Sequence, residues 1–351
     1  MTLKYRRKLF FLSVAGFLII TPPVLLYTAG YRLTDDWSLA KTGGIYIFSP
    51  LSGSEIFINN DLKKQTNLLQ NGIFIQNLKP NIYSALVAKE NFWPWQKNLK
   101  INPQLVTEAR AFLIPRSPEG KTLARGLFIS VFASPFGEIL ILEELKSNNR
   151  KIVFYLPASE EFLTNASIST NQLLSSFGEI NNVYWEEKQT AWLSSLNNSF
   201  LKTEFDFDNK TVRAFSAPAP EDFLSENENQ NFSRRFVKFD KHKKLEIWLE
   251  KDNEIWVEWL KKDNPLPYYL SGEKEMIIKT RSLIKNIDFF PSREDVIIFA
   301  AENGIFALEI DGRGNRNMQP IYKGKNPTFT VNSSQKIVYI LDNGALSKIE
   351  L

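Results

Sequence analysis

The sequence predicts a mainly β protein with one N-terminal transmembrane helix, a small β-sandwich and a larger domain of repeated β-hairpins. Three observations carry this prediction: a basic start before a long uncharged run, alternating apolar and polar residues between turn residues, and hairpin patterns about 40 to 50 residues apart. The expected divisions are a cytoplasmic tail (1–8), the transmembrane helix (9–29), a stalk (30–42), the sandwich (43–115) and the repeat domain (116–351).

The first 29 residues predict where the rest of the chain lies. About twenty residues without a charge run from Leu9 to Ala29. At about 1.5 Å rise per residue, such a run crosses the ~30 Å hydrocarbon core as a helix. Positive residues stay on the cytoplasmic side, so the chain after Tyr31 is expected outside the cell membrane, as a single-pass protein. The four bases that precede the run are Lys4, Arg6, Arg7 and Lys8.

Two other interpretations of this segment stay open. A cleaved secretory signal has the same basic start, and Thr28-Ala29-Gly30 offers small residues for a peptidase. The apolar run is longer than a usual signal, however, and Tyr27 and Tyr31 are typical of an interfacial aromatic belt. A buried helix of a soluble protein is disfavoured because Pro22-Pro23 would break it, whereas a membrane helix tolerates prolines with a kink near this point.

The charge balance and the cysteine count exclude several functions. The chain has 43 Lys+Arg and 39 Asp+Glu, and the first eight residues hold four bases and no acid, so the remainder is neutral. A nucleic-acid partner is therefore not expected, because such proteins carry a basic excess on one face. With no cysteine and one histidine, the sequence predicts no disulfide, no thiolate or zinc site and no cofactor.

The first exterior domain shows the period-two pattern of half-buried strands. Gly43 to Pro50 alternates cleanly, and Asn59-Asn60-Asp61 has the chemistry of a turn. About 70 residues of this kind predict a small all-β sandwich. The expected strands are 43–50, 55–58, 72–78, 82–89, 96–101 and 107–114.

The order of features in this domain resembles the PEGA domain, a short β-sandwich found in bacterial and archaeal cell envelopes. Gly44–Pro50 matches the opening strand and Ser–Pro turn, Ser54–Asn60 the second strand, Leu78–Tyr83 the Pro-Gly-x-Tyr stretch and Asn91–Trp95 the aromatic turn. The resemblance covers residues 43 to 115 and implies a binding or scaffolding role in the envelope. The signature is degraded, since Pro50–Ser54 keeps the proline and glycine but has lost the acid and alanine.

The aromatic turn offers the only candidate contact residues of this domain: Phe92, Trp93 and Trp95. Exposed aromatic side chains stack on sugars or anchor protein interfaces. The resemblance favours another interpretation, in which the turn closes the sandwich core and at least one tryptophan packs inside.

The second exterior domain, after the Pro115–Gly120 boundary, contains a repeated pattern. A polar lead-in precedes an apolar strand, a turn pair and a returning strand in Pro291–Ile310 and again in Asn332–Leu351. Asn303-Gly304 and Asn343-Gly344 are expected at the turns, because Asn-Gly tolerates positive φ at both positions.

Weaker copies of the pattern lie upstream. One runs from Lys241 to Trp259 around Asp252-Asn253, another from Val183 to Leu193 around Lys188-Gln189. The copies resemble WD40-like or TolB-like β-propeller repeats, although the Trp-Asp signature is absent. Residues 121 to 351 allow about five blades, beginning with Phe136–Leu156, and little helix is expected.

The last repeat ends with two clear strands, and a half-built blade would expose unpaired edges. Strands from Lys121 to Phe132 are therefore predicted to complete it and to close the ring. The polar stretch from Pro218 to Asn231 is expected to be a surface loop.

Chemistry-bearing motifs are weak. His242 lies among lysines and is expected at the surface. Asp206–Asn209 lacks the glycine and the distal glutamate of a calcium loop, and Asp311–Asn315 has no following helix to bind phosphate, so both are predicted to be turns. No catalytic, cofactor or metal residue is assigned.

The sequence thus favours a non-catalytic, membrane-anchored extracytoplasmic protein of the cell envelope, which recognises an envelope protein or glycan through its β domains. The alternative is a membrane-anchored carbohydrate-active enzyme, since glycosidases need only two well-spaced acids and a propeller can present them. The available acids include Glu186, Glu187, Glu246, Glu258 and Asp288.

Overall fold

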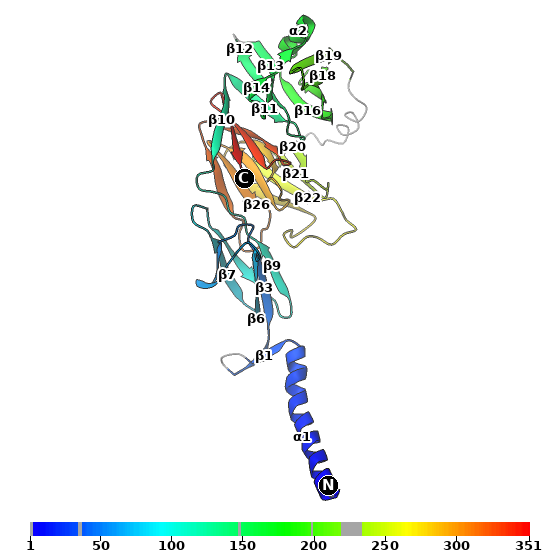
Figure 1. The fold of residues 1–351 in the computed structure, drawn as a ribbon, viewed down its shortest axis with the longest axis vertical. Helices are drawn as coiled ribbons and strands as arrows, with labels where there is room; N and C mark the ends of the chain where they lie inside the picture. Colours follow the sequence, from blue (N-terminus) through cyan, green and yellow to red (C-terminus); the bar gives the residue numbers. More distant parts are fainter. Residues whose placement is uncertain (1–2, 34–36, 147–148, 198, 219–233) are drawn as a thin grey trace. The chain divides into compact units, whose positions relative to one another are not determined.

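The computed structural model spans residues 1–351 and describes all of them except 1–2, 34–36, 147–148, 198 and 219–233 (Figure 1). It confirms a mainly β chain with one N-terminal apolar helix. The chain divides into two compact units, residues 1–113 with 313–317 and residues 114–312 with 318–351. The segment 313–317, which the sequence placed in the second domain, thus groups with the first unit. The predicted surface loop from Pro218 lies almost wholly outside the described residues.

The first unit begins with helix α1 (Leu3–Thr28), which continues through Pro22 and Pro23. Residues Tyr5–Thr28 have a mean hydropathy of 2.3 in their most apolar window, and none of that window is buried. At about 1.5 Å per residue, these 24 residues extend about 36 Å, enough to cross a bilayer. The length and composition of α1 suit either a membrane anchor or a signal peptide.

The segment predicted as a stalk contains a small hairpin, β1 (Tyr31–Leu33) paired with β2 (Leu39–Lys41). Backbone hydrogen bonds join it to its surroundings, with the Thr42 nitrogen donating to the Gly30 oxygen at 3.1 Å. In Figure 1 this hairpin lies where the blue helix meets the sheet that contains β3 and β6.

Two sheets follow, of three strands (β6-β3-β9) and four strands (β5-β4-β7-β8). Alternate residues are buried on each, as with Ile45 and Ile47 on one sheet and Ile56 and Ile58 on the other. Six of the seven strands lie where the sequence predicts them, although the last ends at Arg110. The bounds of all seven are β3 (Gly43–Phe48), β4 (Glu55–Ile58), β5 (Asp61–Gln65), β6 (Gly72–Leu78), β7 (Ile82–Ala88), β8 (Trp95–Lys100) and β9 (Val106–Arg110).

Strand β5 was not predicted, because its residues are mostly polar and exposed and show no alternation. Asn59 and Asn60 adopt positive φ values of 50° and 71° and form the two-residue turn into it, with Ile58 paired to Asp61. Two lysines in β5 are typical of an edge strand, where charge discourages pairing with other chains.

The second unit contains five antiparallel meanders among its described residues. We number them sheet 1 (β11-β12-β13-β14), sheet 2 (β15-β19-β18-β17-β16), sheet 3 (β20-β21-β22-β23), sheet 4 (β24-β25-β26-β27) and sheet 5 (β10-β30-β29-β28). Within sheet 2, the added strand β15 pairs in parallel with β19. The first and last strands of the unit meet in sheet 5.

The strand bounds of sheets 1 and 2 are β11 (Phe128–Ala133), β12 (Leu140–Lys146), β13 (Asn149–Leu156), β14 (Glu161–Phe162), β15 (Thr164–Asn165), β16 (Ile180–Glu187), β17 (Thr190–Ser195), β18 (Phe200–Asp206) and β19 (Thr211–Ser216). Those of sheets 3 and 4 are β20 (Arg234–Phe239), β21 (Leu245–Glu250), β22 (Glu254–Trp259), β23 (Lys274–Lys279), β24 (Ile284–Phe289), β25 (Val296–Ala301), β26 (Gly304–Glu309) and β27 (Met318–Lys323). Those of sheet 5 are β10 (Gly120–Arg125), β28 (Thr328–Asn332), β29 (Ile337–Asp342) and β30 (Ala345–Glu350).

The predicted pairing of the two ends of this domain is present for β10 alone, since β11, which the sequence also assigned to the last blade, belongs to sheet 1. Strand β10 pairs antiparallel with β30 from Gly120–Ile349 to Arg125–Ala345, and Figure 1 shows it beside the red C-terminal strands. The turn Asn343-Gly344 has positive φ at both residues, 51° and 75°. A Cβ on Gly344 would lie 2.2 Å from the Gly126 oxygen, so this close approach requires glycine.

The Asn303-Gly304 turn prediction was wrong by one residue. The loop between Ala301 and Gly304 consists of Glu302 and Asn303, and Gly304 begins β26. Glycine is needed there for a packing reason, since a Cβ would lie 2.6 Å from the Phe306 ring. The predicted turns at Lys188-Gln189 and near Asp252-Asn253 are confirmed.

Sheets of the second unit share hydrophobic cores with their neighbours. On β12, Ile141 belongs to the core that joins sheets 1 and 2, whereas the next residue, Leu142, belongs to the core that joins sheets 1 and 5. A third core joins sheets 3 and 4 through residues such as Ile247 and Phe299. Burial on both faces explains why these strands read as apolar runs.

Helix α2 (Ile168–Ser176) was missed by the sequence analysis. Its N-cap is Ser167, whose Oγ accepts from the Thr170 nitrogen at 3.1 Å, and Leu174 buries into the core of sheets 1 and 2. The helix has only nine residues and few apolar ones, so its periodicity is weak, and the capping serine was the available signal.

Candidate functional site

A cavity of about 1280 Å³ lies in the second unit, and one strand of every sheet contributes to its lining: β11, β16, β20, β24 and β28. Of these strands, β20 adjoins β24, β24 adjoins β28, and β28 adjoins β11. One cavity therefore collects side chains from five segments spread over more than 200 residues. Ligand cavities lined by several strands in this way are typical binding sites.

Four of the five cavity strands share a local irregularity, and β28 does not. The pairing register shifts in β11 between Phe128 and Ser130, in β16 between Ile180 and Asn182, in β20 between Arg235 and Lys238, and in β24 between Ile284 and Asn286. A β-bulge turns a side chain away from the regular alternation, and bulges are frequent beside functional sites. The residues skipped by the pairing all line the cavity: Ile129, Asn181, Phe236, Val237 and Lys285.

One of these residues has an unusual backbone. Phe236 adopts φ 51°, in the left-handed region that a bulky side chain rarely occupies. Such conformations cost about 1–3 kcal/mol and persist where the surrounding structure enforces them. The bulge in β20 is therefore a specified feature of the cavity wall.

Strand β20 brings two arginines to the cavity, and both are paired within the protein. Arg234 Nη1 donates to Glu246 Oε1 at 3.1 Å and its Nη2 to Glu258 Oε2 at 3.2 Å, while the guanidinium lies 4.0 Å from the Trp248 ring centroid. Arg235 forms an ion pair with Asp252. These contacts fix the arginines and neutralise their charge.

Strand β24 brings a cation and an acid that are poorly matched. Lys285 Nζ donates to the Glu302 backbone oxygen at 2.5 Å, and no carboxylate among the described residues lies within 4 Å of it. Asp288 has Lys238 Nζ at 3.8 Å, too far for a hydrogen bond, and its Oδ1 accepts from the Phe289 nitrogen at 2.8 Å. Burial lowers the pKa of Lys285 and raises the pKa of Asp288.

Neutral polar groups complete the cavity wall. Ser130 donates to the buried Glu143, whose other oxygen accepts from the Ile180 nitrogen at 2.8 Å, so this acid is satisfied inside the protein. Asn286 Nδ2 donates to the Phe329 oxygen at 2.6 Å and bridges β24 to β28. The other polar lining residues are Asn181, Asn182, Ser194, Ser195, Asn326, Thr328, Thr330 and Asn343.

Together, the lining contains four basic side chains and one acid, Asp288. Both arginines have close carboxylate partners, whereas Lys285 has only the more distant Asp342, whose charge acts to raise its pKa against the effect of burial, so the net charge of the lining is positive. Hydroxyl and amide groups beside a partly desolvated lysine suit a ligand that has both hydrogen-bonding groups and a negative charge.

The acids considered for a glycosidase do not converge on the cavity. Glu246 and Glu258 lie opposite each other on β21 and β22, but both accept from Arg234. Glu186 accepts from Trp192 Nε1 at 3.0 Å on sheet 2, and these contacts, with Lys202, lower its pKa. Only Asp288 lines the cavity, so the paired acids of a glycosidase are not found there.

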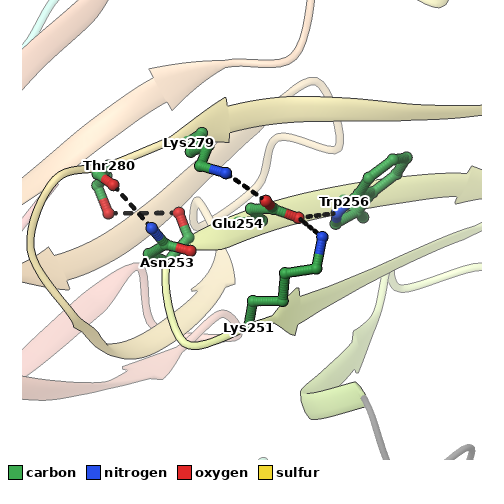
Figure 2. Close-up of polar contacts among 6 residues, drawn as sticks. All are labelled: Lys251, Asn253, Glu254, Trp256, Lys279 and Thr280. Carbon is green, nitrogen blue, oxygen red and sulfur yellow. Dashed lines mark hydrogen bonds and ion pairs between the residues drawn. The ribbon is translucent and has the colours of Figure 1, made fainter.

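A different acid occupies the corner of sheet 3 drawn in Figure 2. The buried Glu254 accepts from Lys279 Nζ at 2.8 Å, from Lys251 Nζ at 3.4 Å and from Trp256 Nε1 at 3.5 Å. The Lys279 contact is the main reason that the pKa of Glu254 is lowered. Glu254 is fully matched, which marks it as structural.

The remaining motifs are placed as turns or surface. His242 is exposed, and its backbone nitrogen donates to Asp240 Oδ2. Asp206–Asn209 forms the turn between β18 and β19, and Asp311–Asn315 connects β26 to β27. Among the described residues, no group of three or more His, Asp or Glu could hold a metal ion.

The aromatic turn of the first unit divides into two environments. Trp95 is 0 % exposed, so its side chain packs inside the unit and does not form part of the surface. Phe92 and Trp93 are half-buried, and Lys89 Nζ lies 5.1 Å from the Phe92 ring. A contact role for these two residues stays a prediction.

The cavity residues Lys238, Lys285 and Thr330 were missed from the sequence. Each lies on the strand just before a repeated polar lead-in, two residues before Asp240 and Asn332 in two of the cases. The strand that precedes each polar lead-in carries the cavity residues, so the repeat itself was the signal that could have located them. What the repeat could not show is the set of bulges, which depends on pairing register.

No protein-family profile and no curated protein matches the chain. Similar solved structures include a protein with a provisional gluconolactonase assignment, at 10 % identity and TM-score 0.37, over 68 % of this chain and 93 % of that one. The β-propeller domain of Cps50 (Swd1) from Myceliophteria thermophila matches at 8 % identity and TM-score 0.40, over 66 % and 100 %. A luciferin-regenerating enzyme matches at 7 % and 0.34, over 67 % and 96 %. At these identities and TM-scores, the likeness concerns propeller-type folds and says nothing about activity.

Proposed function

We propose that the chain is a membrane-anchored, extracytoplasmic binding protein of the cell envelope. Helix α1 is the anchor, with the basic residues Arg6, Arg7 and Lys8 on the cytoplasmic side and the β units outside. The exposed apolar segment of α1 supports a membrane-inserted helix, and its 24 residues from Tyr5 to Thr28 are longer than the apolar core of a usual cleaved signal.

The five sheets of the second unit are, in this proposal, the blades of one closed β-propeller. Support comes from the pairing of β10 with β30, which joins the two ends of the unit in one sheet and removes an exposed edge. The shared cores of sheets 1, 2 and 5 and of sheets 3 and 4 fit blades stacked around an axis. The first unit is proposed to be a PEGA-like sandwich that carries the propeller.

The cavity is the proposed binding site, and the observation that carries the proposal is the convergence of four β-bulges on it. Each bulge costs pairing energy, yet each directs residues into the same space. Lys285, which has no carboxylate within 4 Å among the described residues, and the polar lining favour an anionic, hydroxyl-rich ligand. Among envelope components, such a ligand is an acidic glycan. A single acid supports binding rather than glycosidase chemistry.

The test uses the full chain in lipid nanodiscs as bait. It is exposed to isolated peptidoglycan, to acidic surface polysaccharide and to a neutral glucan, and retained material is quantified. Preferential retention of an acidic glycan of unchanged length is the expected result. Shortening of the retained glycan would instead indicate an enzyme, and retention of no glycan would contradict this ligand class.

A further inference from the structure

Large apolar side chains are exposed around the end of α1. In the β1–β2 hairpin, Leu33 is 60 %, Trp37 84 % and Leu39 56 % exposed, and in the loop into β9, Leu105 and Val106 are more than half exposed. We call these five residues the collar. The hairpin tip between Leu33 and Trp37 lies outside the described residues and is not included.

Hydrogen bonds hold the collar segments against the end of the helix. Gln104 donates from its side chain to the Ala29 oxygen at 2.9 Å and from its backbone to the Thr42 oxygen at 2.8 Å. Thr42 in turn donates to the Gly30 oxygen at 3.1 Å. Each collar segment therefore lies close in sequence to a residue that binds Ala29 or Gly30, the two residues that directly follow α1.

The strand registers place the collar at one end of the sandwich. Gly43 pairs with Leu78 and Gly44 with Val106 at the end next to the hairpin, whereas Phe48 pairs with Gly72 at the opposite end. Leu69, which is 99 % exposed, lies in the loop before Gly72 and therefore at that opposite end. Leu69 provides an internal control for exposure without proximity to α1.

The polar groups beside the collar have the chemistry of a membrane interface. The Arg32 guanidinium lies 3.6 Å from the Tyr27 ring centroid. It donates to the backbone carbonyl oxygens of Tyr27 and Tyr31 at 2.7 and 2.8 Å. Lys41 Nζ lies 5.4 Å from the Tyr31 ring. Tyrosine, tryptophan and basic residues gather at the headgroup level, where lipid phosphates meet the acyl chains.

We infer that the collar lies in the headgroup region of the membrane that α1 crosses and seats the sandwich directly on the lipid surface. The inference rests on the proposed anchor role of α1. Lipid is the chosen occupant because the collar is continuous with the lipid-facing surface of the helix, and because its apolar side chains are accompanied by cations that match lipid phosphates. The first unit then has a fixed end at the membrane.

The absence of cysteine from the chain makes the test direct, since each introduced cysteine is the only labelling site. Four single variants of the full chain, Leu18→Cys, Trp37→Cys, Leu39→Cys and Leu69→Cys, are labelled with an environment-sensitive nitrobenzoxadiazole dye. They are reconstituted in vesicles of phosphatidylcholine and phosphatidylglycerol. Quenching is measured with nitroxide-labelled lipid and, separately, with aqueous iodide.

Labels at 37 and 39 are expected to behave like the label at 18, with strong quenching by nitroxide lipid and iodide quenching at least threefold weaker than at 69. Labels at 37 and 39 that behave like 69, while 18 is quenched by lipid, would overturn the collar and leave the anchor intact. An iodide-accessible label at 18 would overturn the anchor itself. Shielding at 37 and 39 from both quenchers would indicate a protein contact in place of lipid and would also overturn the inference.

Discussion

Strands β20 and β24 border the same cavity, but their charged side chains differ in how closely they are paired with other charges. On β20, Arg234 is held by Glu246 and Glu258, so its charge is matched within sheet 3. On β24, Lys285 donates to a backbone oxygen and interacts with Asp342 only at longer range, and Asp288 has Lys238 no closer than 3.8 Å. A matched charge stabilises the fold, whereas an unmatched charge facing a cavity is available to a ligand. We therefore expect Arg234 on β20 to stabilise the fold and Lys285 on β24 to take part in recognition.

The strongest test replaces one cation on each strand by the same neutral residue. Arg234→Met leaves two partly buried glutamates unpaired and is expected to lower the free energy of unfolding by about 1–3 kcal/mol. Lys285→Met removes a cation whose pKa is lowered by burial, so its charged form already costs stability at neutral pH, and no loss is expected. Urea unfolding of both variants measures the difference. Equal losses would remove the distinction between the strands.

The same lysine change tests recognition. Lys285→Met is expected to weaken binding of an acidic oligosaccharide about tenfold, which is about 1.4 kcal/mol. Lys146→Met, an exposed cation at the end of β12 outside the cavity, is the matched control and should bind like the unmodified protein. Isothermal titration calorimetry provides the affinities. A similar loss in both variants would indicate a general charge effect.

Neutralising Glu254 on sheet 3 and neutralising Asp288 on sheet 4 should change the melting temperature in opposite directions. Glu254→Gln loses the Lys279 contact that lowers its pKa, so the melting temperature at pH 7 should fall. The raised pKa of Asp288 means that its ionised form is disfavoured in the folded state. Asp288→Asn should therefore raise the melting temperature at pH 7, and the gain should disappear as pH falls through the raised pKa toward the usual 3.8.

These changes are followed by calorimetric melting between pH 3 and pH 8. Below the usual carboxylate pKa, Asp288 is protonated in the folded and unfolded states alike, so the variant and the parent should converge there. A gain for Asp288→Asn that persists unchanged at pH 3 would show that the effect is not electrostatic.

The smallest expected effect concerns the long contact between Lys238 and Asp288. Since Lys238 is the cation that lowers the pKa of Asp288 among the described residues, Lys238→Met should raise that pKa further. The stability change should stay within about 0.5 kcal/mol, as for other weak surface pairs. Carboxyl-carbon NMR titration reports the pKa of Asp288. An unchanged value would place Lys238 away from this acid in solution.

The sequence predicted those parts of the fold that depend on local patterns. Alternation located β3, β4, β6 and β7, and the hairpin around Asn343-Gly344 was correct because its turn needs two positive φ values. The pairing of β10 with β30 could also be predicted, since an unpaired edge at the end of the chain is costly. Strand β5 and helix α2 were missed because polar, exposed or short segments carry little periodicity.

The site was much less accessible to sequence reasoning. Lys285 and Asp288 look like ordinary polar positions of a strand, and only the register shift beside Lys285 directs it into the cavity. Glu246 and Glu258 looked equally available as catalytic acids, because their shared partner Arg234 belongs to another strand. Long-range pairing therefore decides which charges are matched, and no local pattern encodes it.

The central claim, that the cavity is the binding site, is tested most directly by blocking it. Asn182 is exposed at the bulge of β16 and lines the cavity, so Asn182→Trp should fill space there without entering a hydrophobic core. Titration of an acidic galacturonate oligomer into the full-length protein and into this variant compares the two affinities. The account predicts binding by the parent and at least a tenfold loss in the variant. Equal affinity in both proteins would contradict it and would place the binding site elsewhere.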